Sequence, residues 1–122
     1  YYAGYGWFSV KDMTNFPLYK TCKIKVQTAK TLELTGTLET SVTYDFAQGF
    51  NWYGIPSTNE VVVEDFLPGT WEAGDSILCH DAMTDYYAGY GWFSSKGMTT
   101  ISQGMGCKIK KVTAGTYTHN IT

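Results

Sequence analysis

Three consecutive residues, Cys79, His80 and Asp81, bring a nucleophile, a base and an acid together in the chain. Neighbouring side chains of an extended or turning segment point in different directions, so these three cannot form the hydrogen-bonded relay that nucleophilic catalysis needs. Carboxylate pairs such as Glu64-Asp65 could serve glycoside hydrolysis or calcium binding, but the chain has no DxDxDG loop. The sequence therefore provides no catalytic residues, and we expect that the protein is not an enzyme.

Metal and cofactor sites also lack their usual patterns. The three cysteines and two histidines show no CxxC or Cys/His spacing for zinc, and no Gly-rich loop with Lys leads a strand into a helix. His119 shares one face of an expected closing strand with Tyr117 and Ile121, where a packed or surface histidine is the ordinary explanation. We expect no metal and no cofactor.

Composition excludes several classes of protein. The 122 residues are 43% hydrophobic and 16% charged, which is typical of a chain that folds. A net charge of −2 without any Arg argues against a nucleic-acid binder. No apolar run is long enough for a transmembrane helix. Because the chain begins with neither Met nor a signal peptide, we expect that its start is processed or truncated.

An internal repeat organises the chain. Residues 1–37 and 86–122 align without a gap at an offset of 85, with 20 identities in 37 positions. The alignment starts with YYAGYGWFSVKDMT against YYAGYGWFSSKGMT and continues with TCKIKVQTAKT against GCKIKKVTAGT. A fixed offset indicates that one structural unit has been copied. We predict one complete unit over 38–122, preceded by an orphan second half over 1–37 whose first half is missing.

Charge separates along the same boundaries. The orphan half 1–37 carries five Lys and two acids, the first half 38–85 carries nine acids and no Lys, and the second half 86–122 carries four Lys and no acid. Alternating blocks of this kind suggest that acidic and basic halves face one another. The alternative is that solvated surfaces have drifted in charge.

The secondary-structure pattern is nearly all strand. Cys22, Ile24 and Val26 alternate with polar residues, as do Cys107 and Ile109 in the second copy, and this period of two marks a half-buried strand. Turn sequences follow every several residues, and at most one helical turn is expected, around 76–84. We predict an all-β fold, either an antiparallel sandwich or a small barrel-like unit. Further strand candidates lie at 32–34, 42–46, 51–55 and 61–63.

The order FNWYGIPS, then an aromatic Gly-Trp segment, then TTISQGMGCKIKKVTAGTYT resembles the tandem β-repeats of secreted and cell-surface proteins. Those repeats run as a GWNLIGYP-like strand, a GW turn, a "tLePGkGYWIKv" strand and a closing "aatltvsG" strand. The resemblance covers about 47–122 and again 1–37, and it implies an extracellular β-rich module, used in arrays, without catalytic residues. The chain departs from the pattern at Cys22 and Cys107, where an aromatic usually follows Gly-x-Gly, and at FPLYKTC, which lacks the glycines.

The cysteines can be interpreted on that basis. Cys22 and Cys107 are equivalent, and the equivalent of Cys79 would precede Tyr1. In an extracellular β protein the natural disulfide joins Cys79 to Cys107, which leaves Cys22 for a preceding unit, in cis or in another molecule. The alternative is three reduced, buried cysteines that act as small apolar residues, because spacing alone cannot fix connectivity.

A repeated aromatic block has two interpretations. It could form a platform on which sugar rings stack, or its glycines could form tight turns over which the aromatics pack as structure or as interface anchors. Repetition of the whole block favours the structural interpretation. The residues are Tyr1, Tyr2, Tyr5, Trp7 and Phe8, repeated as Tyr86, Tyr87, Tyr90, Trp92 and Phe93.

Together these features favour an extracellular or cell-surface structural protein. A complete unit plus an orphan half has two different interaction surfaces. Contacts between two different surfaces of the same protein are heterologous, and they propagate into open filaments. The orphan half would dock against 38–85, or against the open edge of the complete unit, in the next copy, or in a neighbouring repeat of a longer array. The alternative is a carbohydrate-binding or adhesive module with glycans as ligands. The sequon at Asn120 is a candidate glycosylation site.

Overall fold

A computed structural model describes residues 3–4, 20–33 and 35–121. In this part of the chain every regular element is a strand except for one 3-10 turn, η1 (Val63–Asp65), so the expected all-β class is confirmed. The strands are β1 (Ser41–Phe46), β2 (Gly49–Gly54), β3 (Val61–Val62), β4 (Ser76–Leu78), β5 (Met83–Tyr87), β6 (Gly91–Phe93), β7 (Thr100–Ile101), β8 (Gly106–Lys111) and β9 (Gly115–Asn120).

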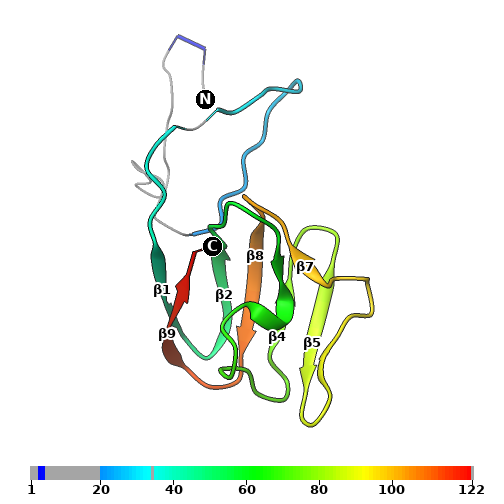
Figure 1. Cartoon of the computed structure of the whole chain (residues 1–122). Coiled ribbons are helices and arrows are strands. Elements are labelled where there is room, and N and C mark those ends of the chain that lie inside the picture. The colour runs from blue at the N-terminus through cyan, green and yellow to red at the C-terminus, as the bar shows by residue number, and fades with distance from the viewer. Residues whose placement is uncertain (1–2, 5–19, 34, 122) are drawn as a thin grey trace.

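All strand pairs are antiparallel and fall into three sheets, arranged as in a sandwich (Figure 1). The main sheet has the order β2-β8-β4-β5-β6, so β8, from the second half of the unit, lies between two strands of the first half. The first and last strands, β1 and β9, pair along their whole length, from Ser41 opposite Asn120 to Phe46 opposite Gly115. A small third sheet joins β3 to β7. The two halves of the 38–122 unit are therefore interleaved and neither forms a sheet alone.

Strict alternation produces the core. Along β1, Val42, Tyr44 and Phe46 are buried while the residues between them are exposed, which fits a strand with one face inward. Aromatic rings continue this core across the unit. Tyr44 contacts Phe66 with ring centroids 5.7 Å apart, and Phe66 in turn contacts Trp71 at 5.9 Å. Edge-to-face and tilted pairs of this kind add to the stability that burial provides.

The sequence expectations for turns hold in part. Residues Glu72–Asp75 form one of the turns, in which the Asp75 amide donates to the Glu72 carbonyl at 2.9 Å. Gly74 adopts a φ of 95° there, a conformation that suits glycine. At most one helical turn was expected around 76–84, and this segment instead forms β4, which pairs with β8, and the start of β5. The helical turn that does occur is η1.

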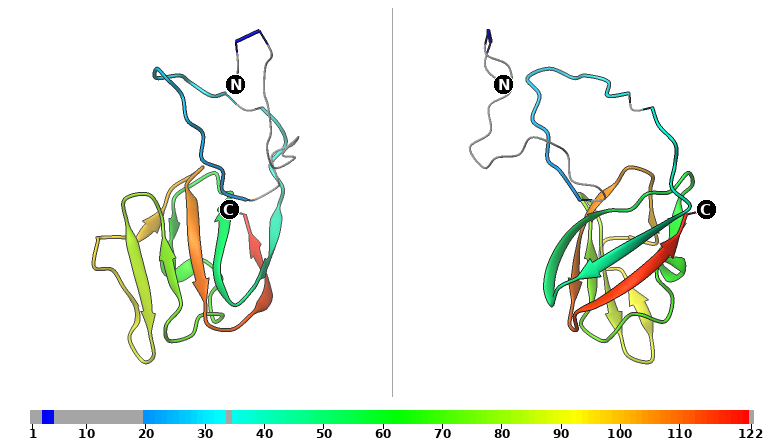
Figure 2. Two further views of the ribbon diagram at one scale, coloured as in Figure 1. Left: turned by 180° about the vertical axis from the view of Figure 1, so that it is seen from behind. Right: turned by 90° about the vertical axis from the view of Figure 1, so that its left-hand side faces the viewer.

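Residues 20–33 and 35–40, which we call the arm, differ most from expectation. Cys22, Ile24 and Val26 have the alternation of a half-buried strand, yet the structure assigns no strand to the arm. Figures 1 and 2 show it as a loop that projects from the end of the sheets. Strands form by pairing with other strands: β8 pairs with β2 and β4, whereas residues 20–33 pair with no strand in the described part of the chain.

Candidate functional site

The two halves of the unit are joined by a buried ion pair. Lys111, the last residue of β8, forms an ion pair with Asp75, and both side chains are at most 1% exposed. The Lys111 Nζ also donates to the Thr70 carbonyl at 2.8 Å. It lies 4.6 Å from the centroid of the Trp71 ring, on which a cation is favourable. A residue of the acidic half and a residue of the basic half thus meet in the core.

Asp75 is fully satisfied by hydrogen bonds. Its Oδ1 accepts from the Val112 amide at 2.7 Å, and its Oδ2 accepts from the Glu72 amide at 2.9 Å. The burial of this charged carboxylate depends on the Lys111 cation, because a buried charge without a partner strongly destabilises a fold. Sequence patterns did not identify this pair. The available signal was the inward-facing position of Lys111 in the alternation Cys107, Ile109, Lys111.

Cys79 and Cys107 form a disulfide across the same interface, between the chain after β4 and strand β8. This is the pairing expected within a complete unit, and it means that neither residue carries a free thiol. Cys22 is a free cysteine and is exposed. The catalytic interpretation of Cys79-His80-Asp81 thereby loses its nucleophile, and the His80 Nδ1 contacts the Asp81 carboxylate on the surface.

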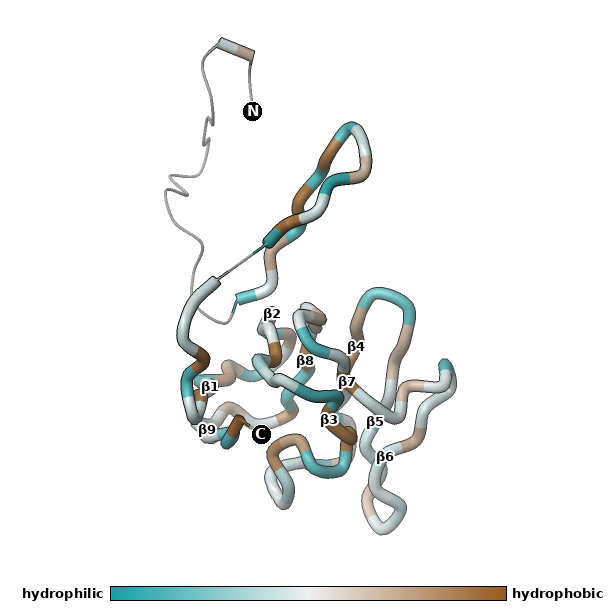
Figure 3. The backbone as a smooth tube through the Cα atoms, turned by 45° about the horizontal axis from the view of Figure 1, so that its top comes forward, coloured by the Kyte–Doolittle hydropathy of each residue, from teal (hydrophilic) through white to brown (hydrophobic). Residues whose placement is uncertain are grey.

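The arm touches the unit beside β2 and β8 without joining either strand. Thr21 Oγ1 donates to the Cys107 carbonyl at 3.4 Å, and the Lys20 Nζ lies 3.8 Å from the centroid of the Tyr53 ring. Beyond these contacts the apolar residues of the arm face solvent, with Ile24 and Val26 each 54% exposed and Leu32 68% exposed. Figure 3 shows apolar and polar positions alternating along this projecting segment.

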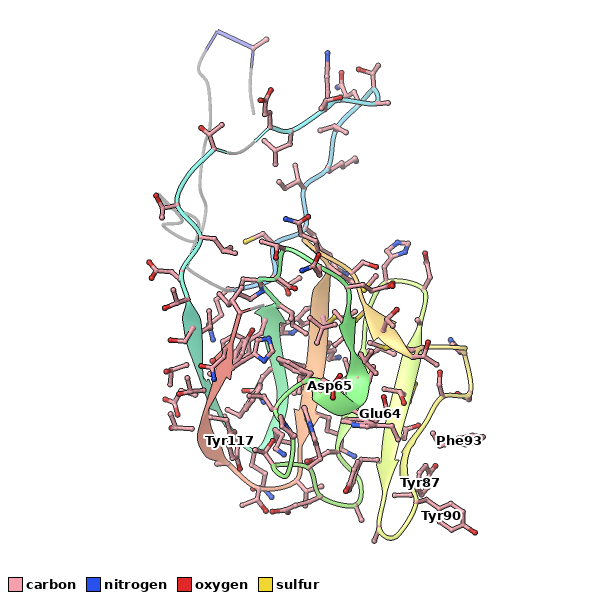
Figure 4. All side chains as sticks on the ribbon, viewed as in Figure 1. Glu64, Asp65, Tyr87, Tyr90, Phe93 and Tyr117 are labelled. Carbon is pink, nitrogen blue, oxygen red and sulfur yellow. A yellow bond between two sulfur atoms is a disulfide. The ribbon has the colours of Figure 1, made fainter. Side chains whose placement is uncertain are left out.

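The aromatic block divides into packed and exposed members. Trp92 packs edge-on against Trp71 with centroids 4.8 Å apart and against Tyr86 at 5.3 Å. Tyr87 and Phe93, by contrast, are exposed and contact each other at 6.3 Å. Tyr90, at the tip of the β5–β6 hairpin, is 92% exposed, and Figure 4 shows it pointing away from the core. The equivalent residues Tyr1, Tyr2, Tyr5, Trp7 and Phe8 lie outside the described residues.

A pocket of about 730 Å³ is lined by residues of β3, of the chain around and after η1, and of β9. His119 contributes to its wall, but the His119 side chain is itself buried, and its Nε2 has no hydrogen-bond partner in the described part of the chain. Its ring lies edge-on to Phe66 at 5.1 Å. Burial lowers the pKa of the His119 imidazole from its ordinary value of 6.5, so this histidine behaves as a packed core residue. Asn120 of the sequon is exposed.

The described residues hold neither a cluster of metal ligands nor a membrane-spanning helix. Over 3–4, 20–33 and 35–121, no three His, Cys, Asp or Glu side chains gather as they would around a metal ion. Within those ranges no helix has the length and apolar character to cross a membrane.

Comparison of the chain with protein-family models, with curated proteins and with solved structures finds no match.

Proposed function

We propose that the protein is a structural module of an extracellular filament or surface array, held together by completion of the orphan half 1–37. A first half-unit from a neighbour, either another copy or an adjacent repeat, would supply strands equivalent to β2 and β4. The arm segment 21–26 would then pair between them, as β8 does in the complete unit.

The observation that supports this proposal is that the same sequence, Cys-Lys-Ile-Lys, is paired and has its apolar residues buried at 107–110 but is exposed and, among the described residues, unpaired at 22–25. In the complete unit Ile109 is 0% exposed and Cys107 is bonded to Cys79, whereas the equivalent Ile24 is 54% exposed and Cys22 is free. Exposed apolar residues at alternate positions of an unpaired segment favour strand addition, because pairing buries them and satisfies backbone hydrogen bonds. The disulfide supports the extracellular location, since such bonds persist in oxidising compartments.

Negative-stain electron microscopy of the native assembled material, with and without reductant, tests this function. We expect regular fibres or arrays, and we expect them to shorten or dissociate on reduction if Cys22 bonds to the neighbour. A matched variant, Cys22→Ser, should weaken assembly while leaving the Cys79–Cys107 bond in place, and it thus separates the loss of a Cys22 bond from reduction within the unit. Small monodisperse particles under both conditions would contradict the proposal.

A second function is a carbohydrate-binding module. It is supported by the exposed rings of Tyr87, Tyr90 and Phe93 at the β5–β6 hairpin, since stacking on such rings is a common way to hold sugars. This function predicts a sugar-dependent change in fluorescence that Tyr90→Ala abolishes without changing particle size. Trp92→Ala is the poorer variant, because Trp92 packs against Trp71 and its loss would also destabilise the unit.

A further inference from the structure

The core-facing residues of the two second halves differ in chemistry. At the position of Lys111 the orphan half has Val26, at that of Tyr117 it has Leu32, and at that of His119 it has Leu34. The Lys111 cation, the Tyr117 ring whose centroid lies 5.4 Å from the Lys111 Nζ, and the buried His119 imidazole are thus all replaced by aliphatic residues. Cys22 and Ile24, by contrast, are identical in type to Cys107 and Ile109. The orphan half therefore keeps the disulfide position and loses the polar part of the core.

We propose that the partner of the orphan half is a first half-unit that has a cysteine equivalent to Cys79 but an uncharged residue in place of Asp75. This inference rests on the proposed function and names the partner of the same surface. It implies that segment 38–85 of a second copy is not the cognate partner, and that the partner is a different repeat with its own sequence.

Burial of Asp75 is the physical basis of this selectivity. In the complete unit the carboxylate is 0% exposed and its charge is balanced by the Nζ of Lys111. If the orphan half paired with 38–85, Val26 would stand at the position of Lys111 and offer no cation. The carboxylate would then be buried without a counter-charge, and that is strongly unfavourable.

The difference between Lys111 and Val26 also prevents the orphan half from replacing 86–122 as the partner of 38–85 in the same chain. Both second halves contain the pattern Cys-Lys-Ile-Lys, so both could in principle compete for the single first half 38–85. Only 86–122 brings the lysine that Asp75 requires, and the bond between Cys79 and Cys107 secures that choice. The orphan half is thereby left available for a neighbour.

Capture of synthetic half-units by the full chain tests the inference. Two peptides spanning 38–85 are prepared, one with the native sequence and one with Asp75→Asn, which removes the charge and keeps an oxygen for the backbone donors. In each, the Cys79 sulfur carries a 5-thio-2-nitrobenzoate group. The Cys22 thiolate attacks that sulfur, the Cys22–Cys79 bond forms, and the bond to nitrothiobenzoate breaks with release of its coloured thiolate.

For the wild-type chain we expect release from the Asp75→Asn peptide to be at least about tenfold faster than from the native peptide at limiting concentration. In the Val26→Lys chain, which restores the cation, the preference should reverse. The matched control is Gln27→Lys, which adds the same charge at the next position; its equivalent, Val112, follows β8 and is exposed, so this change should leave the wild-type preference unchanged. The Cys22→Ser chain provides the blank.

Two other results would overturn the inference in distinguishable ways. Equal rates for the two peptides, or a preference of the wild-type chain for the native one, would show that Asp75 does not select the partner, while completion of the orphan half would stand. If neither peptide reacts faster than it does in denaturing guanidinium, half-unit completion itself is wrong, and the proposed function fails with it.

Discussion

At the scale of single residues, Lys111 is a buried side chain that joins the two halves of the unit. It balances a fully buried carboxylate, donates to a backbone carbonyl and lies against the Trp71 ring. We predict that Lys111→Val, which copies the residue of the orphan half, lowers the free energy of unfolding by about 3 to 5 kcal/mol, because Asp75 loses its counter-charge. Urea denaturation measures this loss.

The control is Lys110→Val, one position earlier and on the opposite face of β8, which should change the free energy of unfolding by about 0.5 kcal/mol or less. Equal effects of the two substitutions would show that the buried pair contributes no more than a surface lysine.

His119 predicts a pH dependence of stability. Burial lowers its pKa below 6.5 in the folded state, so the unfolded chain binds more protons as the pH falls through that value. The stability associated with neutral His119 is fully present above about pH 6.5 and is lost as the pH falls toward the folded-state pKa, by at most about 1.4 kcal/mol per pH unit.

His119→Leu, which copies Leu34 of the orphan half, should flatten this part of the dependence. Thermal unfolding of both proteins between about pH 7.5 and pH 5 measures the difference. Parallel curves for the two proteins would show that His119 titrates normally in the fold.

At the scale of elements, β8 depends on the bond between Cys107 and Cys79. This disulfide closes a loop with a sequence separation of 28, for which chain entropy predicts about 3 to 4 kcal/mol of stabilisation. We predict that Cys107→Ser lowers the free energy of unfolding by about that amount. Cys22→Ser is the matched control and should leave the stability of the unit unchanged, because Cys22 is free and exposed. A similar loss in both variants would contradict the structure.

Alternation predicted β1 and β8 well, but it did not predict β4 and β5, where at most a helical turn was expected. Val42, Tyr44 and Phe46 in β1, and Cys107 and Ile109 in β8, all face inward as their spacing indicates. Alternation failed at the arm, where Cys22 and Ile24 have the same pattern and form no strand. The pattern records which face of a strand can be buried, but pairing depends on partners far away in the sequence.

The ion pair between Asp75 and Lys111 was not predicted from the sequence, for a related reason. Asp75 and Lys111 lie 36 residues apart and meet only because β4 pairs with β8, a contact that the sequence does not reveal. The alternating charge of the halves indicated such a contact without identifying the residues. The sequence also did not predict which residues of the aromatic block are exposed and which are packed, because the geometry of the β5–β6 hairpin decides which side of the sheet each ring occupies.

At the scale of the whole molecule, a unit over 38–122 is preceded by a segment, 22–26, that has the pattern of β8 and pairs with no strand among the described residues. Within the complete unit, β9 pairs with β1 and β8 is enclosed between β2 and β4 (Figure 1). The apolar residues of the arm remain exposed. Under the proposed function, a first half-unit from a neighbour pairs with the arm, and segment 21–26 becomes the strand equivalent to β8.

Amide hydrogen exchange, read by mass spectrometry on the isolated chain and on the assembled material, tests this central claim most directly. In the isolated chain we expect rapid exchange at 22–26 and slow exchange at the equivalent 107–111. In the assembled material the amides of 22–26 should become protected to a similar degree as those of 107–111. Amides of 22–26 that exchange as fast in the assembly as in the isolated chain would contradict the proposed completion of the orphan half.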